Sequence, residues 1–191
     1  MLTNALIFLV QTVCGLFVVA LLLRFYLQWA RAPYRNPLSE FLHALTDFMV
    51  RPARRIVPGL WGLDLATLVL AWLVQFVELL LVLQIQGHDL AQNAGPALAS
   101  AALLALVLLM KTGLYIVMAA VIMQVVLSWL SPHSPVMPLL NGMTRPLLRV
   151  FQRRIPPLGN VDLSPLFALV VIQLLLMLPV AWLELTVPRL F

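Results

Sequence analysis

The chain has 191 residues, of which 63% are hydrophobic and 10% are charged, and its net charge is +5. A soluble domain carries roughly 25% charged residues. A water-soluble chain of this length could not hide so much apolar surface from solvent. The composition therefore excludes an ordinary soluble domain and predicts a protein whose surface largely faces lipid.

Four apolar stretches follow one another along the chain, and each exceeds the roughly 20 residues that a helix needs to cross a bilayer. They cover residues 2–30, 63–85, 97–130 and 163–185. Lipid offers the backbone no hydrogen-bonding partner, so each stretch is expected to be an α-helix. The predicted fold class is all-α, a helical transmembrane protein with four spans. The third stretch exceeds a simple crossing, so we expect it to tilt or to project beyond the bilayer.

The connections between these spans differ in charge. Nine of the 12 basic residues lie in the first and third connections, whereas residues 87–95, between the second and third spans, contain none. The positive-inside rule places arginine-rich connections in the cytoplasm. We therefore expect a multi-pass protein of the cell inner (cytoplasmic) membrane with both termini outside. Trp29 and Trp129, which close the first and third spans, are typical of membrane interfaces.

The two halves of the chain are similar to each other. With a shift of 98 residues, 11 of 39 aligned pairs are identical over residues 37–75, and Trp29 aligns with Trp129 at a shift of 100. The identities include Pro, Arg, Asp and Gln, which chance similarity between leucine-rich segments would not supply. Both halves cross in the same sense, so this is a parallel duplication. The predicted organisation is a first repeat over residues 1–86, an external connection over residues 87–96 and a second repeat over residues 97–191.

Each arginine-rich connection carries apolar residues at helical spacing. They are Leu38, Phe41, Leu42, Leu45 and Phe48 in the first connection, and Val136, Leu139, Leu140, Met143 and Leu147 in the second. Such a stripe flanked by arginines predicts an amphipathic helix in the plane of the membrane interface. The alternative is that the stripe packs on the bundle itself. In the second connection Gly142 and Pro146 predict two short helical pieces, the latter capped by Thr144.

The same connections carry a recurrent set of motifs. Asn36-Pro37 precedes the first amphipathic helix, and Arg51-Pro52, residues 54–58 (Arg-Arg-Ile-Val-Pro) and Gly62-Leu63-Asp64 follow it. The second copy has related motifs at residues 144–149, 153–156 and 161–165. In this combination the chain resembles, over essentially its whole length, the duplicated form of the YggT family of small bacterial and plastid integral membrane proteins. The family is loosely associated with osmotic-stress tolerance, ion homeostasis, envelope or division organisation and membrane-complex assembly. The resemblance therefore implies a role in one of these processes and no enzymatic activity.

No residue pattern predicts catalysis, which needs a nucleophile, acid or base held by partners. The three histidines His43, His88 and His133 lie far apart in different connections, and His88 is expected on the outer side. No His or Cys pair has the spacing of a zinc site. We therefore predict a non-enzymatic protein with no catalytic residues, no cofactor and no metal.

Polar residues inside apolar spans are a better indication of function, because they are costly there. The candidates, including two at the starts of spans, are Arg24, Asp64, Gln75, Glu78, Lys111, Asp162 and Gln173. Arg24 is expected to snorkel to the interface, or to pair with Asp64 or Asp162.

Two further pairings are expected among these residues. By helical rise Glu78 and Lys111 both fall in the outer third of the bilayer, where they would form either a packing clamp or an ion or proton site. Gln75 and Gln173 are related by the repeat and lie near mid-membrane. Two such amides are expected to hydrogen-bond between helices.

These patterns favour a non-enzymatic inner-membrane protein whose arginine-rich cytoplasmic loops dock anionic membrane lipids or other membrane or division proteins. Such a protein would support envelope organisation or osmotic-stress and ion homeostasis. The alternative is a channel or transporter component for an ion or small solute that uses the intramembrane polar residues. The positive charge sits between membrane spans, which excludes nucleic acid as a partner, and a homo-oligomer is compatible with the pattern. The arginines expected on the docking face are Arg35, Arg51, Arg54, Arg55, Arg145, Arg149, Arg153 and Arg154.

Overall fold

The structure, a computed structural model, describes residues 1–33, 36–59, 63–87, 94–131, 133–154 and 162–189. Every regular element within these ranges is helical, and four helices are long and apolar enough to cross a membrane. The predicted all-α fold with four spanning helices is therefore confirmed. The chain is a multi-pass membrane protein.

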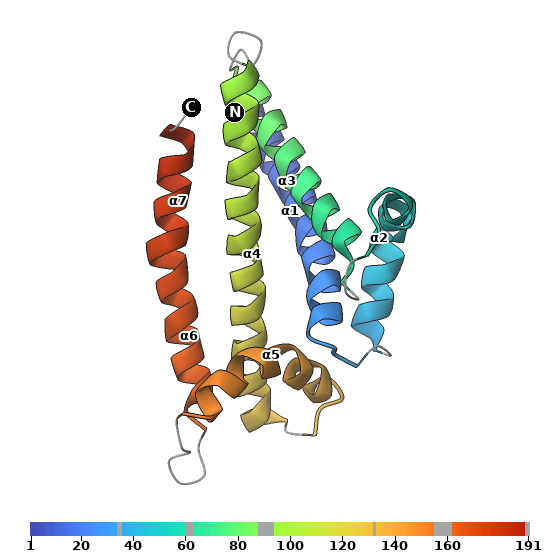
Figure 1. Cartoon of the computed structure of the whole chain (residues 1–191), viewed down its shortest axis with the longest axis vertical. Helices are drawn as coiled ribbons and strands as arrows, with labels where there is room; N and C mark the ends of the chain where they lie inside the picture. Colours follow the sequence, from blue (N-terminus) through green and yellow to red (C-terminus); the bar gives the residue numbers. More distant parts are fainter. Residues whose placement is uncertain (34–35, 60–62, 88–93, 132, 155–161, 190–191) are drawn as a thin grey trace.

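The first half contains two spanning helices and one helix between them. Helices α1 (Leu2–Trp29) and α3 (Leu65–Ile85) pack side by side, and α2 (Pro37–Ile56) contacts both of them (Figure 1). The Asn36 side chain caps α2 by accepting a hydrogen bond from the Ser39 amide at 2.8 Å.

The second half repeats this order of elements. It contains α4 (Ala94–Leu130), α5 (Met137–Gln152) and a fourth span that runs without a break through α6 (Ser164–Leu175), a π-helical turn (Leu176–Val180) and α7 (Ala181–Thr186). A short 3-10 turn, Val187–Arg189, follows. The π turn contains Pro179, which has no amide hydrogen and cannot complete a regular α-helical ladder. Helix α5 contacts α4 and α6 as α2 contacts α1 and α3.

Helix α4 lies at the centre of the bundle. Helices α1 and α3 lie on one side of it and α6 and α7 on the other, and the start of α1 and the end of α7 lie at the same end of the bundle (Figure 1). The Trp72 indole donates a hydrogen bond to the Ala102 carbonyl at 3.0 Å, which joins α3 to α4. We call the opposite end, where α1 and α4 terminate and which carries α2 and α5, the arginine end.

The core is thin and the outer surface of the spans is strongly apolar. Small and branched residues such as Val18, Leu21 and Ala71 are at most 1% exposed, whereas Phe8 is 70% exposed and Leu178 is 64% exposed. Water would disfavour such a surface, but lipid tails would not. The exposed belt is therefore what a membrane-spanning bundle requires.

Helix α5 is continuous, so the prediction of two short pieces is wrong. Leu140, Met143 and Leu148 are buried on one face, and this packing stabilises the helix through Pro146. Thr144 is not a cap, because it lies inside the helix and its hydroxyl donates to the Leu140 carbonyl at 2.9 Å.

Gly142 serves close packing of α5 rather than a helix break. A Cβ atom at Gly142 would lie 3.1 Å from the Ala32 Cα atom and 3.3 Å from the Pro33 Cδ atom. The missing side chain thus lets α5 of the second half approach the segment that follows α1 of the first half.

The predicted apolar stripe of α2 is divided between two faces. Leu42 is 2% exposed and packs inside with Thr46 and Val50, whereas Phe41 is 61% exposed and Phe48 is 68% exposed. Packing on the bundle therefore holds for part of the stripe, and contact of the rest with the membrane interface stays a prediction. One row packs on the bundle, and an opposite apolar row remains on the surface.

Candidate functional site

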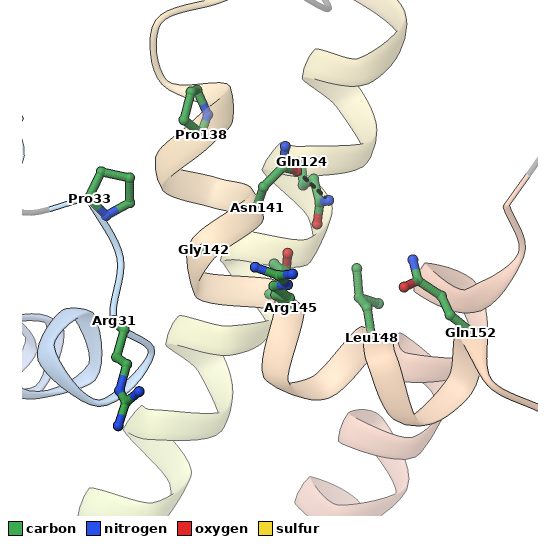
Figure 2. Close-up of a pocket in the computed structure, with 10 residues that line it drawn as sticks. Arg31, Pro33, Gln124, Pro138, Asn141, Gly142, Arg145, Leu148 and Gln152 are labelled. Carbon is green, nitrogen blue, oxygen red and sulfur yellow. Dashed lines mark hydrogen bonds between the residues drawn. The ribbon is translucent and has the colours of Figure 1, made fainter.

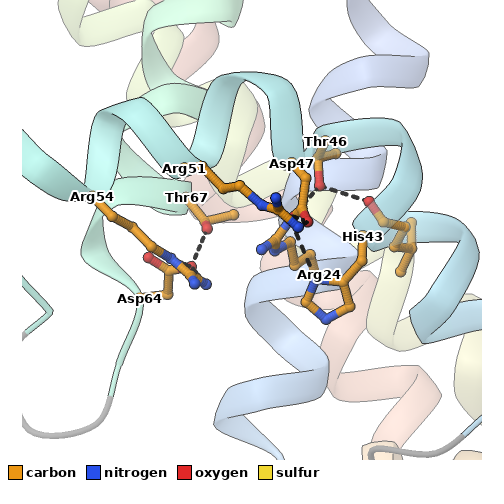
Figure 3. A network of polar contacts seen from close by, with 9 residues as sticks. Arg24, His43, Thr46, Asp47, Arg51, Arg54, Asp64 and Thr67 are labelled. Carbon is orange, nitrogen blue, oxygen red and sulfur yellow. Dashed lines mark hydrogen bonds and ion pairs between the residues drawn. The ribbon is translucent and has the colours of Figure 1, made fainter.

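A buried ion pair fastens α2 to α1 at the arginine end. Arg24 is 5% exposed, and its Nη1 atom donates hydrogen bonds of 2.7 Å to both Asp47 Oδ1 and Thr46 Oγ1 (Figure 3). The expectation that Arg24 would pair with Asp64 or Asp162 is wrong. Helix α2 packs against α1 and places its own acidic side chain, Asp47, beside Arg24.

Asp47 joins two arginines. Its Oδ2 atom accepts a hydrogen bond from Arg51 Nε at 3.0 Å and lies 2.8 Å from Arg51 Nη2, and His43 Nδ1 lies 3.6 Å from Oδ1. Burial raises the pKa of Asp47, but the hydrogen bonds from Arg24 and Arg51 outweigh it and hold the pKa below its ordinary value. The ionised carboxylate is therefore favoured in the folded protein.

A second ion pair fastens α2 to the start of α3. The Arg54 guanidinium donates to Asp64 Oδ2 at 2.5 and 3.1 Å, and the Thr67 hydroxyl donates to the same oxygen at 2.6 Å. Burial raises the pKa of Asp64, but the hydrogen bonds from Arg54 and Thr67 outweigh it and lower the pKa overall. Asp64 is thus a structural anchor at the arginine end, although it was predicted as a partner of Arg24.

The second half repeats this contact with different chemistry. Gln152 Nε2 donates to Asp162 Oδ2 at 2.9 Å, and the Ser164 amide donates to Asp162 Oδ1 at the same distance. Burial raises the pKa of Asp162, but hydrogen bonds from Ser164 and Gln152 outweigh it and lower the pKa. Gln152 stands ten residues before Asp162, as Arg54 stands ten residues before Asp64. An amide has replaced the guanidinium at a matching position.

The predicted docking arginines fall into two groups. Arg51 and Arg54 are engaged with Asp47 and Asp64, whereas Arg35 lies outside the described residues. Within the described ranges, no acidic side chain lies at ion-pair distance from the exposed arginines Arg31, Arg55, Arg145, Arg149, Arg153 and Arg154.

A polar cavity of about 440 Å³ opens beside α5 (Figure 2). Arg31 and Pro33 border it from the segment after α1, and Arg145 and Asn141 border it from α5. Gln124 of α4 also lines it, and its Nε2 atom donates to Asn141 Oδ1 at 2.8 Å. Sequence analysis had not selected Arg31, Gln124 or Asn141. For two of them a signal was available in the repeat, which aligns Gln124 with Arg24 and Asn141 with His43.

The predicted Glu78–Lys111 pair is wrong. Lys111 Nζ instead contacts Glu184 of α7 at 2.7 and 2.9 Å, while Glu78 accepts a hydrogen bond from Gln75 Nε2 at 3.0 Å. Lys111 therefore faces α7, away from the position of Glu78 on α3. Glu184 lay within the predicted fourth span and was overlooked.

The expected hydrogen bond between Gln75 and Gln173 is also absent. Gln75 is 6% exposed and bonds to Glu78, whereas Gln173 is exposed on α6. Helix α4 separates α3 from α6 in the described part of the chain, so the two amides do not meet. Among the described residues, no group of three or more His, Cys, Asp or Glu side chains could hold a metal ion.

Comparison with known proteins agrees with this duplicated architecture. The CCB3/YggT family model matches residues 3–85 and again residues 103–183. This chain belongs to the CCB3/YggT family. The resemblance inferred from the arginine-rich motifs is confirmed, and the two matches fit the duplicated YggT form.

Relatives of this YggT-family chain occur in several bacteria. An uncharacterized Pseudomonas aeruginosa protein is 38% identical over 179 residues, which cover 93% of this chain and 89% of the relative. The protein YggT of Escherichia coli K12 is 29% identical over 174 residues, covering 90% and 87% of the two chains. A Vibrio alginolyticus protein is 30% identical over 171 residues, covering 89% and 90%. No solved structure matches the chain.

Proposed function

We propose that this YggT-family chain is a non-enzymatic inner-membrane protein whose arginine end faces the cytoplasm and docks anionic lipids. Through this contact it supports envelope organisation or osmotic-stress and ion homeostasis. The observation that carries the proposal is the group of exposed arginines on α2 and α5 without acidic partners among the described residues. Membrane and division proteins are the competing occupants of this face.

The surface of α2 supports a lipid contact. Phe41, Leu45 and Phe48 form an exposed apolar row, and Arg55 is exposed beside that row. An apolar row bordered by arginine suits the boundary between acyl chains and headgroups. Each arginine near an anionic surface contributes about 1 kcal/mol, and salt weakens the effect.

The test uses the full-length chain reconstituted with brominated lipids, which quench nearby tryptophans such as Trp29 and Trp129. We expect brominated phosphatidylglycerol to bind with a higher relative affinity than brominated phosphatidylcholine, and the difference to shrink in high salt. The test variant carries glutamine at Arg55, Arg149, Arg153 and Arg154, and the matched control carries lysine at the same four positions.

The glutamine variant should lose the preference for phosphatidylglycerol several-fold, whereas the lysine control should keep most of it. A glutamine variant with an undiminished preference would show that these arginines serve topology or internal packing. Loss of a bound membrane protein without any change in lipid preference would assign the face to a protein partner.

The transport alternative retains one supporting observation. Glu78 is 8% exposed inside a spanning helix, and Gln75 is its hydrogen-bonding partner. Intramembrane carboxyl groups are costly and often functional. If the chain conducts ions, proteoliposomes should show a flux that Glu78→Gln reduces. Absence of flux from the wild-type chain would remove this candidate.

A further inference from the structure

The two repeats carry different charges at two pairs of aligned positions. The shift of 100 residues that aligns Trp29 with Trp129 also aligns Arg24 with Gln124, and the shift of 98 residues aligns Asp47 with Arg145. The first repeat therefore has a buried arginine and a carboxylate at positions where the second has an amide and a guanidinium. An ion pair is possible only in the first.

The spaces beside these residues also differ in size. In the first repeat the cavity beside Arg24 and His43 has a volume of only about 20 Å³. In the second repeat the cavity beside Gln124 and Asn141 has a volume of about 440 Å³. Because Asn141 aligns with His43, corresponding side chains border both spaces. Arg24, which borders the smaller space, is held by Asp47, whereas Gln124, which borders the larger one, is bound only by the neutral Asn141 side chain among the described residues.

Hydrogen-bond donors predominate around the open cavity. Arg31 and Arg145 have no acidic partner among the described residues, and the Asn141 oxygen accepts the bond from Gln124, which leaves the Asn141 amide nitrogen as a donor (Figure 2). The Gln124 Oε1 atom is buried and has no hydrogen-bonding partner among the described residues. Gln152 is already bound to Asp162. Two guanidinium groups and an amide favour a ligand with several anionic oxygens.

The backbone holds Arg31 at the rim of the cavity. Arg31 has a φ of 51°, in the left-handed region, and the Ala32 amide donates to the Leu27 carbonyl at 3.0 Å. This is the geometry of a helix-terminating turn that usually contains glycine. A non-glycine residue there costs roughly 1–2 kcal/mol. Close packing of Ala32 on Gly142 fixes this segment against α5.

The depth of the cavity favours a lipid over a soluble ion. Gln124 lies five residues before Trp129, which is about 7.5 Å toward the bilayer centre by helical rise. Tryptophan at the end of a span marks the headgroup region. The phosphate of a neighbouring lipid starts only about one and a half helical turns from this depth, whereas a soluble anion would have to leave bulk water to reach it.

We propose that the second repeat holds the phosphate of one anionic phospholipid in this cavity, and that the Arg24–Asp47 ion pair closes the corresponding place in the first repeat. The inference rests on the proposed function, because it names a specific lipid site at the arginine end. It differs from that function in requiring a single bound lipid, held by Arg145, Arg31 and Asn141, in addition to surface attraction.

The test transfers the closing ion pair from the first repeat to the second. Gln124→Arg combined with Arg145→Asp recreates the residues of the first repeat and changes the net charge by −1. Asn4→Asp, in the first turn of α1 at the opposite end of the bundle, also changes it by −1 and is the matched control. Native mass spectrometry of the full chain would measure retained dioleoyl phosphatidylglycerol against phosphatidylcholine.

Wild-type protein and Asn4→Asp should retain one phosphatidylglycerol, and the double variant should bind it at least tenfold more weakly with its thermal stability unchanged. If the double variant does not fold, Arg145→Gln should show the same loss. Undiminished binding in every cavity variant that folds would overturn the proposal. Displacement of the lipid by millimolar glycerol 3-phosphate would overturn the lipid as occupant, because it would show a site for soluble phosphate.

Two sets of variants distinguish the cavity site from the broader docking function. The variant with four glutamines at the exposed arginines leaves the cavity intact and should keep the tightly held lipid. The cavity double variant should keep the general preference for anionic lipid in the quenching experiment. An unchanged general preference in the four-glutamine variant would contradict surface docking alone. Undiminished binding of the tightly held lipid in the double variant would contradict the cavity site alone.

Discussion

Asp47→Asn tests whether the buried ion pair is what fastens α2 to the bundle. The substitution keeps the shape of the side chain but removes the charge that faces Arg24. Arg24 is 5% exposed and Asp47 is 24% exposed, so the positive charge would remain buried with only neutral acceptors. We expect the variant to be clearly less stable than the wild-type protein.

The magnitude follows from the geometry of the pair. Removing one partner of a fully buried ion pair costs about 3–5 kcal/mol. Asp47 is partly exposed and the Thr46 hydroxyl still accepts from Arg24, so we expect a loss of about 2 kcal/mol. For a chain of this size that is a decrease of about 4–8 °C in the melting temperature. Arg51→Gln should cost less than about 1 kcal/mol, because Arg51 is 77% exposed.

Thermal unfolding in detergent, followed by circular dichroism, would measure these differences. Arg24→Leu combined with Asp47→Asn should recover most of the loss, since no buried charge is then left unpaired and Arg51 is largely exposed. If Asp47→Asn were no more damaging than Arg51→Gln, the ion pair would not be the anchor of α2.

The same pair predicts how stability depends on pH. The pKa of Asp47 is lowered in the folded protein, so its contribution is present above the unfolded pKa of about 3.9 and is lost as pH falls through the folded pKa. The stability difference between wild type and Asp47→Asn should therefore persist at pH 7 and shrink below about pH 4. A difference that stayed constant through this acidic range would contradict an electrostatic origin.

Three other predictions concern different parts of the molecule. Glu184→Gln should destabilise the chain by about 1–3 kcal/mol by leaving Lys111 unpaired in the membrane, and leucine at both positions should restore stability in a thermal unfolding assay. A cysteine at His88 should be labelled from outside intact cells and one at Arg149 should not, whereas the reverse pattern would overturn the proposed orientation. Gly142→Leu should lower the melting temperature by overpacking α5 against Ala32, at a cost of about 1–3 kcal/mol, and an unchanged melting temperature would show that this contact yields easily.

The partners of the polar side chains inside the spans could not be predicted from the sequence. Helical rise gave the depth of Glu78 and Lys111 but not the direction in which each side chain points. Lys111 turns toward Glu184 because α7 packs on that side of α4, and α3 packs on another. A prediction based on depth alone therefore paired two side chains that the packing of the helices keeps apart.

The sequence by itself determined the membrane class, the four helical spans, the internal duplication and the family. These follow from hydrophobic length, the distribution of arginine and the repeated motifs, which are properties read along one chain. Only the tertiary structure decided the partners of Arg24 and Lys111, the continuity of α5 and the open cavity at Gln124. These features depend on which helix faces meet, and that is set by the packing of side chains distant in sequence.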